Sequence, residues 1–174
     1  MGYDESKSLT WRLPVNIKRS LFLFVLLLAV FTSACQRNIT RNADGSLLVE
    51  TSITAQALQE ALQAAIADPL IKEISVSLQS GYVLVSGQRE RLNDSSKSDT
   101  LSFRLDLGVS NGKLTAVVSQ AVLDGKPLDQ ARIEHWNETI AARLQKIGQN
   151  RVNAVLQSVV VSPDGIQMTW QVSR

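Results

Sequence analysis

The pattern of apolar and polar positions along this chain changes its period several times, and each period predicts an element. A period of two predicts strands buried on one face, and it is cleanest in LSFRLDLGV, residues 101–109. Similar strands are expected at 47–53, 71–79, 82–90 and 114–123, with a hairpin at 159–172. Asn111-Gly112 is the preferred dipeptide of a type I′ turn, and Pro163-Asp164-Gly165 is expected to turn the last hairpin.

A spacing of three and four residues predicts two helices. Leu58, Leu62 and Ile66 lie four apart after Thr54, a residue type that caps helix N-termini. Asp129 or a neighbour begins a second helix, expected at roughly 130–157 and about 40 Å long. Its apolar stripe consists of Ile133, Trp136, Ile140, Leu144, Ile147, Val152 and Val155. The polar stretches at 36–46 and 91–99 predict a tether and a loop.

These elements follow one another in the order β-α-ββ-ββ-α-ββ. Several strands with one apolar face must bury that face, and two striped helices are available to cover it. The order therefore predicts an α+β domain with its helices on one face of an antiparallel sheet. The 139 residues after Cys35 are enough for one such domain with its own core.

The strongest apolar peak lies near the N-terminus, where Leu21 to Phe31 form an uninterrupted run of eleven residues. A transmembrane helix needs about 20 apolar residues, so this run is too short. Basic residues precede it and the small residues Thr32-Ser33-Ala34 follow it, which is typical of a secretory signal peptide. Cys35, the only cysteine, then resembles the acylated cysteine of a bacterial lipobox, although Thr32 stands where that motif usually has leucine.

Three alternatives to this lipoprotein interpretation remain open. Ordinary signal cleavage before Cys35 would leave a lone thiol in an oxidising compartment, and an uncleaved segment would act as an anchor. Met1-Gly2 also begins a match to the loose myristoylation pattern. We expect a signal peptide at 1–34, a lipidated cysteine and tether at 35–46, and one α+β domain at 47–174. This layout places the protein in the bacterial cell envelope, lipid-anchored on the extracytoplasmic face of a membrane.

The net charge of the exported part excludes one class of partner. The chain has 18 basic and 16 acidic residues, of which the first 35 positions hold four and two, so 14 of each sign remain. A formally neutral domain has no excess positive field to attract nucleic acid. Its four aromatic residues are scattered, which also argues against a surface for base stacking. We expect no nucleic-acid partner.

No pattern for catalysis or metal binding emerges from the sequence. His135 is the only histidine, and once Cys35 is acylated no cysteine remains, so a zinc site lacks ligands. No G-x-S-x-G element is present to expose a nucleophilic serine, and the carboxylates are spread singly along the chain. The sequence therefore predicts a protein that is not an enzyme and needs no cofactor.

The segments ITAQALQEALQAAI, ISVSLQSGYVLVSG and LSFRLDLGVSNGKLTAVVSQAVLDGKPL resemble those of bacterial tubular lipid-binding (TULIP-like) proteins. The LmeA-like phospholipid-binding family and the YpmS-like family are the closest comparisons, over about residues 46–173. The resemblance implies a strongly curved antiparallel sheet packed around the long C-terminal helix, with a shorter N-terminal helix. It also implies an apolar groove for acyl chains. The candidate wall of that groove is Leu58, Leu62, Phe103, Leu105, Ile140, Leu144, Met168 and Trp170.

Two functions follow from these patterns. The first is a membrane-anchored lipoprotein whose non-enzymatic domain binds phospholipid or fatty acyl chains in the apolar groove. The second is a structural or adaptor lipoprotein whose apolar positions all form a closed core and whose surface contacts other envelope proteins. Periodicity alone is explained equally well by an open groove and by a closed core, so the sequence leaves both hypotheses standing.

Overall fold

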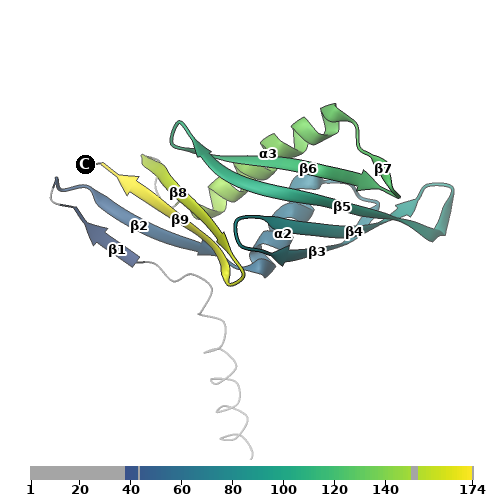
Figure 1. Ribbon diagram of the computed structural model, residues 1–174, viewed down its shortest axis with the longest axis horizontal. Helices are drawn as coiled ribbons and strands as arrows, with labels where there is room; N and C mark the ends of the chain where they lie inside the picture. The colour runs from purple at the N-terminus through teal and green to yellow at the C-terminus, as the bar shows by residue number, and fades with distance from the viewer. Residues whose placement is uncertain (1–37, 43, 150–152, 174) are drawn as a thin grey trace, which may run out of the picture. The chain divides into compact units, whose positions relative to one another are not determined.

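The computed structural model describes residues 38–42, 44–149 and 153–173, and the chain divides into two units, Met1–Ala34 and Cys35–Arg174 (Figure 1). All described elements belong to the second unit. They form two antiparallel sheets and two helices, so the predicted α+β class is confirmed, although the strands make two sheets where one was expected. The helices are α2 (Ala55–Ile66) and α3 (Gln130–Gly148).

The first sheet has the strand order β1-β2-β9-β8 and the second has the order β3-β4-β5-β6-β7. The strands of the first sheet are β1 (Asn38–Arg41), β2 (Leu47–Ile53), β9 (Gly165–Val172) and β8 (Ala154–Ser162). Those of the second are β3 (Ile71–Leu78), β4 (Val83–Arg91), β5 (Asp94–Ser110), β6 (Lys113–Leu123) and β7 (Lys126–Pro127). Neighbours along the second sheet are consecutive in the chain, so each pair is a simple antiparallel connection.

The predicted helix caps and hairpin turns are confirmed. The Thr54 hydroxyl accepts a hydrogen bond from the Ala57 amide (3.2 Å), and the Asp129 carboxylate accepts one from the Arg132 amide (2.8 Å). Both bonds satisfy amides that the first helical turn leaves unpaired. Asn111 and Gly112 have φ of 52° and 72°, as a type I′ turn between β5 and β6 requires.

The second helix is shorter than predicted. It ends at Gly148, and Val155, expected on its stripe, lies on β8 and is 45% exposed. Val152 lies outside the described residues. Gln149 turns extended and its side-chain amide donates to the Ala154 carbonyl (3.2 Å), so the chain enters β8 almost directly. Pairing of β8 with β9 outweighs the helical spacing because the segment is rich in β-branched valine.

Two polar stretches were also predicted wrongly as lacking regular structure. The stretch expected as a loop at 91–99 contains the beginning of β5, which pairs with β4 from Asp94 onward. The stretch expected as a tether contains β1, which pairs with β2 from Asn38 to Arg41. Both segments are exposed on a hairpin or sheet edge, where backbone pairing does not require apolar side chains.

The two sheets meet along β8. On the side of β8 that does not pair with β9, the Gly81 amide donates to the Val161 carbonyl (3.0 Å) and the Leu156 amide donates to the Gly112 carbonyl (2.9 Å). Gly81 and Gly112 lie in the β3–β4 and β5–β6 turns. Two hairpin tips of the second sheet therefore contact the edge strand of the first.

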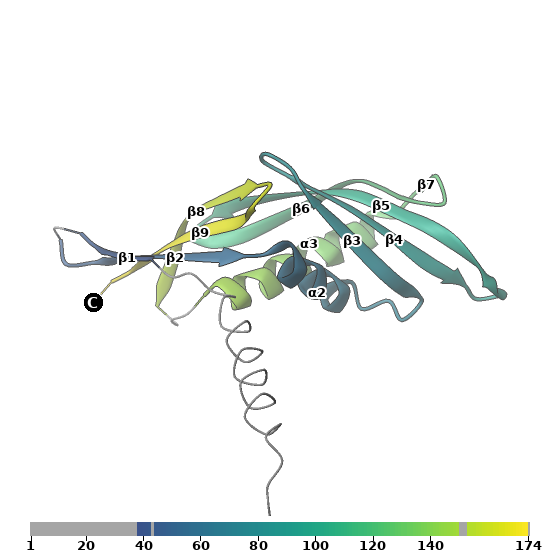
Figure 2. The same cartoon turned by 90° about the horizontal axis from the view of Figure 1, so that it is seen from below.

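Both helices lie on one side of the strands (Figure 1, Figure 2). The N-terminal half of α3 packs on the second sheet, where the rings of Trp136 and Phe103 are 5.6 Å apart. Its C-terminal end packs on the first sheet. There a Cβ added to Gly148 would lie 2.6 Å from the Met168 sulfur and 3.2 Å from the Trp170 ring, so only glycine fits without movement of these side chains.

The core contains one buried polar contact across the first sheet. The Trp170 indole N–H donates to the Thr51 hydroxyl (3.0 Å), and both residues are buried. Within the described part of the chain, no buried side-chain nitrogen or oxygen lacks a hydrogen-bond partner. Among the same residues, no helix is both long and apolar enough to span a membrane.

We expect Leu144→Ala to lower the free energy of unfolding by about 2–5 kcal/mol, because Leu144 is 0% exposed and its removal leaves a cavity. Chemical denaturation monitored by circular dichroism measures the change. Ile147→Ala on the same helix is the matched control, because Ile147 is 47% exposed. Its effect should stay within about 0.5 kcal/mol. Equal losses in the two variants would contradict the observed orientation of α3.

Candidate functional site

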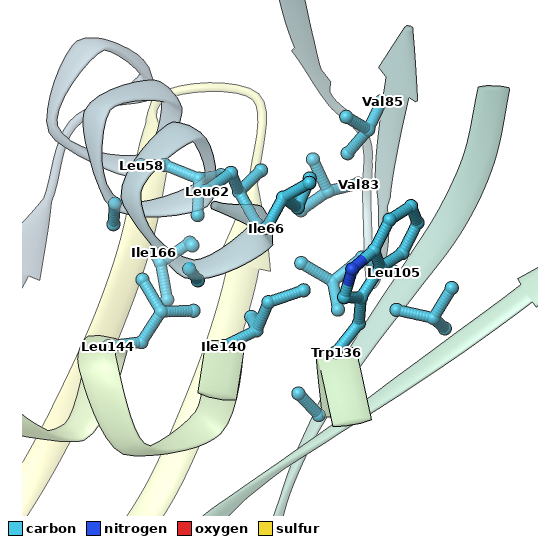
Figure 3. Close-up of a cluster of buried hydrophobic side chains, with 14 of the residues drawn as sticks. Leu58, Leu62, Ile66, Val83, Val85, Leu105, Trp136, Ile140, Leu144 and Ile166 are labelled. Atoms are coloured by element: carbon cyan, nitrogen blue, oxygen red, sulfur yellow. The ribbon is translucent and has the colours of Figure 1, made fainter. Parts of the chain in front are cut away.

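The residues predicted to line an acyl-chain groove come together, but as a closed core. All eight belong to one buried cluster, and their exposed fractions lie between 0% and 3%: Leu58, Leu62, Phe103, Leu105, Ile140, Leu144, Met168 and Trp170. Figure 3 shows side chains from α2, α3 and the strands pointing into the same interior. Space for an acyl chain would require these side chains to move apart.

Depressions of the described surface lie outside this core. One is a cleft of about 720 Å³ between α2 and α3, which we call the helix cleft. Its lining residues are Ala64, Ala65, Ala67, His135, Thr139, Ala142, Arg143, Lys146 and Ile147. Three of these can carry positive charge and none is acidic, so the cleft combines small apolar side chains with a basic rim.

The second depression, about 390 Å³, lies on the outer face of the second sheet. We call it the serine face, since Ser75, Ser77, Ser86 and Ser102 line it. These serines alternate with core residues along their strands, as expected for a solvated sheet face. A third depression of about 660 Å³ lies beside α2 and β3 and has mainly polar and charged lining residues.

An ordered group of charged and aromatic side chains borders the serine face. Arg104 makes a bidentate contact with Asp106, with hydrogen bonds of 2.6 to 3.1 Å, and its guanidinium carbon lies 4.1 Å from the ring centre of Tyr82. The Arg104 hydrogen bonds lower the pKa of the Asp106 carboxyl. The side chains of Arg104 and Asp106 are both 36% exposed. The ion pair therefore fixes the orientation of these two side chains on the surface, but it contributes little to the free energy of unfolding.

Asp68 holds the connection between α2 and β3 against β4. One carboxylate oxygen accepts from Arg89 (2.9 Å) and the other from the Leu70 amide (3.0 Å). Burial alone would raise the pKa of the Asp68 carboxyl, but these hydrogen bonds outweigh burial and lower it. This contact is structural, because both carboxylate oxygens of Asp68 accept hydrogen bonds from groups that hold the α2–β3 connection in place.

The surroundings of His135 do not favour catalysis. It is exposed on α3 and lines the helix cleft, and neither a serine nor a cysteine lines that cleft with it. Among the residues that the structure describes, no three histidine, cysteine or carboxylate side chains are grouped as metal ligands.

The basic rim of the helix cleft was not predicted from the sequence. Arg143 and Lys146 lie three residues apart on α3, beside the exposed Ile147. Two cations three residues apart on one predicted helix were the available signal, but this spacing becomes informative only when α2 is seen to form the other wall of the cleft. Cys35, the predicted lipidation site, lies outside the described residues.

Comparison of this chain with protein-family models, with curated proteins and with solved structures finds no match.

We expect Asp68→Asn to lower the free energy of unfolding by about 1–3 kcal/mol at neutral pH, because a charge-assisted contact is lost. Since folding lowers the pKa of Asp68, its stabilising contribution is complete above the unfolded value of about 3.9. The contribution is lost as pH falls through the lower folded value. Urea denaturation across this pH range should show the difference between wild type and variant shrinking below about pH 4.

Glu138→Gln is the control for this series, because Glu138 is exposed on α3 and is remote in sequence from the Asp68 connection. Its difference from wild type should stay within about 0.5 kcal/mol at each pH. If the difference in free energy of unfolding between wild type and Asp68→Asn persists at low pH, the effect arises from the changed shape and hydrogen bonding of the side chain and not from its charge.

Proposed function

We propose that this protein is a lipid-anchored component of the bacterial cell envelope whose non-enzymatic domain acts through its surface, as a structural or adaptor protein. The observation that carries this proposal is the closed core. The side chains that would line an acyl-chain groove are at most 3% exposed. The described depressions combine polar or basic side chains with apolar ones and lie open on the surface, which suits contact with other envelope components.

The anchor in this proposal is Cys35, which follows a basic segment, a short apolar run and small residues. Two acyl chains on this cysteine would give stable attachment, whereas a single chain would give only marginal attachment. The protein would then be held on the extracytoplasmic face of a bacterial membrane by its first mature residue.

Binding of phospholipid or fatty acid inside the domain is a second candidate function. It is favoured by the composition of the interior, where apolar side chains from α2, α3 and both sheets surround Ile140 and Leu144 (Figure 3). The TULIP-like resemblance and its strongly curved sheet belong to this candidate. It requires an opened state in which an acyl chain replaces contacts among the core residues, at a favourable free energy of about 0.8 kcal/mol for each buried CH₂.

We expect Cys35→Ser to abolish the acylated form and to block processing or release the protein from the membrane. Mass spectrometry of the mature protein and fractionation of cells measure the two effects. Retention of the variant in the membrane with residues 1–34 still attached would instead support an uncleaved anchor. A mature mass without acyl chains in the wild type would exclude the lipoprotein proposal directly.

We expect residues 36–174, produced without the anchor, to carry no lipid in native mass spectrometry if the core stays closed. Titration with a fluorescent fatty-acid analogue should then leave the combined emission of the buried Trp136 and Trp170 unchanged. Circular dichroism and a cooperative unfolding transition establish first that this fragment is folded. Copurified phospholipid, or a shift of the tryptophan emission on lipid removal, would overturn the closed-core proposal in favour of the lipid-binding candidate.

A further inference from the structure

The first strand begins very close to the proposed anchor. Asn38 pairs with Glu50 at the start of β1, only three residues after Cys35. Three residues of chain reach at most about 11 Å. The edge of the first sheet at Asn38 must therefore lie within that distance of an acylated Cys35, so the domain cannot stand away from the membrane.

This edge is on the same sheet that receives the C-terminal end of α3. Thr51 follows Glu50 along β2, and its hydroxyl lies 3.6 Å from where a Cβ on Gly148 would be. The part of α3 that ends at Gly148 is therefore the part nearest to β1. Its exposed residues are the ones placed to meet a lipid surface.

Charge is distributed unequally along α3. The N-terminal half carries Glu134 and Glu138, whereas the half from Ile140 to Gly148 carries Arg143 and Lys146 and no acidic residue. Among the described residues, neither Arg143 nor Lys146 takes part in an ion pair; the other basic residue of the helix, Arg132, contacts Asp129. The positive half is the one that packs on the first sheet.

Apolar side chains accompany these cations on the helix side of the domain. Ile147 is 47% exposed at the rim of the helix cleft. Ile39 is 64% exposed, and because it pairs with Val49 its side chain points to the sheet face on which α3 packs. Arg41 pairs with Leu47 and shares that face. Cations beside exposed aliphatic groups are typical of a surface that lies in the membrane interface.

We infer that the helix side of the first sheet docks on an anionic phospholipid surface, with Arg143, Lys146 and Arg41 at the phosphates and Ile147 and Ile39 among the headgroups. This inference rests on the proposed anchor at Cys35, because the short connection holds this face at the membrane. The serine face lies on the opposite side of the second sheet and stays exposed for other envelope components. Figure 2 shows the side of the strands on which the helices lie.

The test uses the full, processed chain in vesicles of phosphatidylcholine containing a minority of phosphatidylglycerol. With Cys35 acylated, Ile147→Cys supplies one free thiol for a nitroxide label. Val117→Cys is the matched control, since Val117 is 52% exposed on the outer face of β6. We expect the label at position 147 to be several-fold less accessible to a water-soluble relaxation agent than the label at 117.

A second arm tests the role of charge. The double variant Arg143→Gln/Lys146→Gln should raise accessibility at position 147 to the level of the control. An increase to 1 M salt, which shortens the Debye length to about 3 Å, should act in the same direction. The variant Lys113→Gln/Lys126→Gln, which removes two cations from the second sheet, should have no effect on the label at 147.

Equal accessibility at positions 147 and 117 would overturn the inference and leave the lipid anchor intact. Protection at 147 in native membranes but not in protein-free vesicles would also overturn it, in favour of a protein partner. Protection that survives both charge removal and high salt would exclude the anionic surface as the occupant. The mass of the purified protein decides separately whether Cys35 is acylated, so a failure of the anchor is distinguished from a failure of docking.

Discussion

The packing of α3 across two sheets is the constraint on which the rest of the domain depends. Trp136 contacts the second sheet and Gly148 contacts the first, so a single rigid helix fixes the distance between them. The sheets themselves are joined at the edge of β8 by backbone hydrogen bonds to two hairpin tips. Those bonds alone would leave a hinge. The helix removes that freedom, because bending the sheets would pull its apolar stripe out of close-packed contacts.

The sequence predicted the local features well because they depend on few neighbouring residues. Helix caps at Thr54 and Asp129 and the Asn111-Gly112 turn follow from the chemistry of one or two side chains. The errors lie where pairing with distant segments decides the outcome. The beginning of β8, residues 154–157, was assigned to the second helix because valines three residues apart fit a helical stripe, whereas β9, with which it pairs, lies beyond the next turn. Strand β1 was missed for the same reason: its residues are mainly polar, and its structure depends on pairing with β2.

The candidate site was harder to predict than the fold, and the reason is physical. Period-two and period-four patterns indicate which side chains leave water, and all eight candidate wall residues do leave it. The same patterns do not reveal whether a buried face meets a ligand or another buried face of the chain. The sequence pattern around Leu144 fits both cases equally, and the support for a closed core comes from the burial of these side chains among α2, α3 and the strands. A surface feature such as the helix cleft is formed by two elements, so it can be recognised only once their arrangement in the fold is known.

The proposed closed core changes the role that the proposed acylation of Cys35 would have. If the domain held lipid inside, a tether of three residues would hinder the movement that lipid transfer requires. If the domain acts by contact, the same short connection is useful, because it restricts the orientations available to the domain and so presents one surface repeatedly. The arrangement of charge agrees with the second case. Arg143 and Lys146, which make no ion pair with any described residue, lie on the half of α3 that packs on the first sheet, whose strand β1 begins three residues after the proposed anchor. The ion pairs of Arg89 and Arg91 lie on the second sheet. The short connection and the uneven charge thus favour a fixed orientation over a mobile carrier.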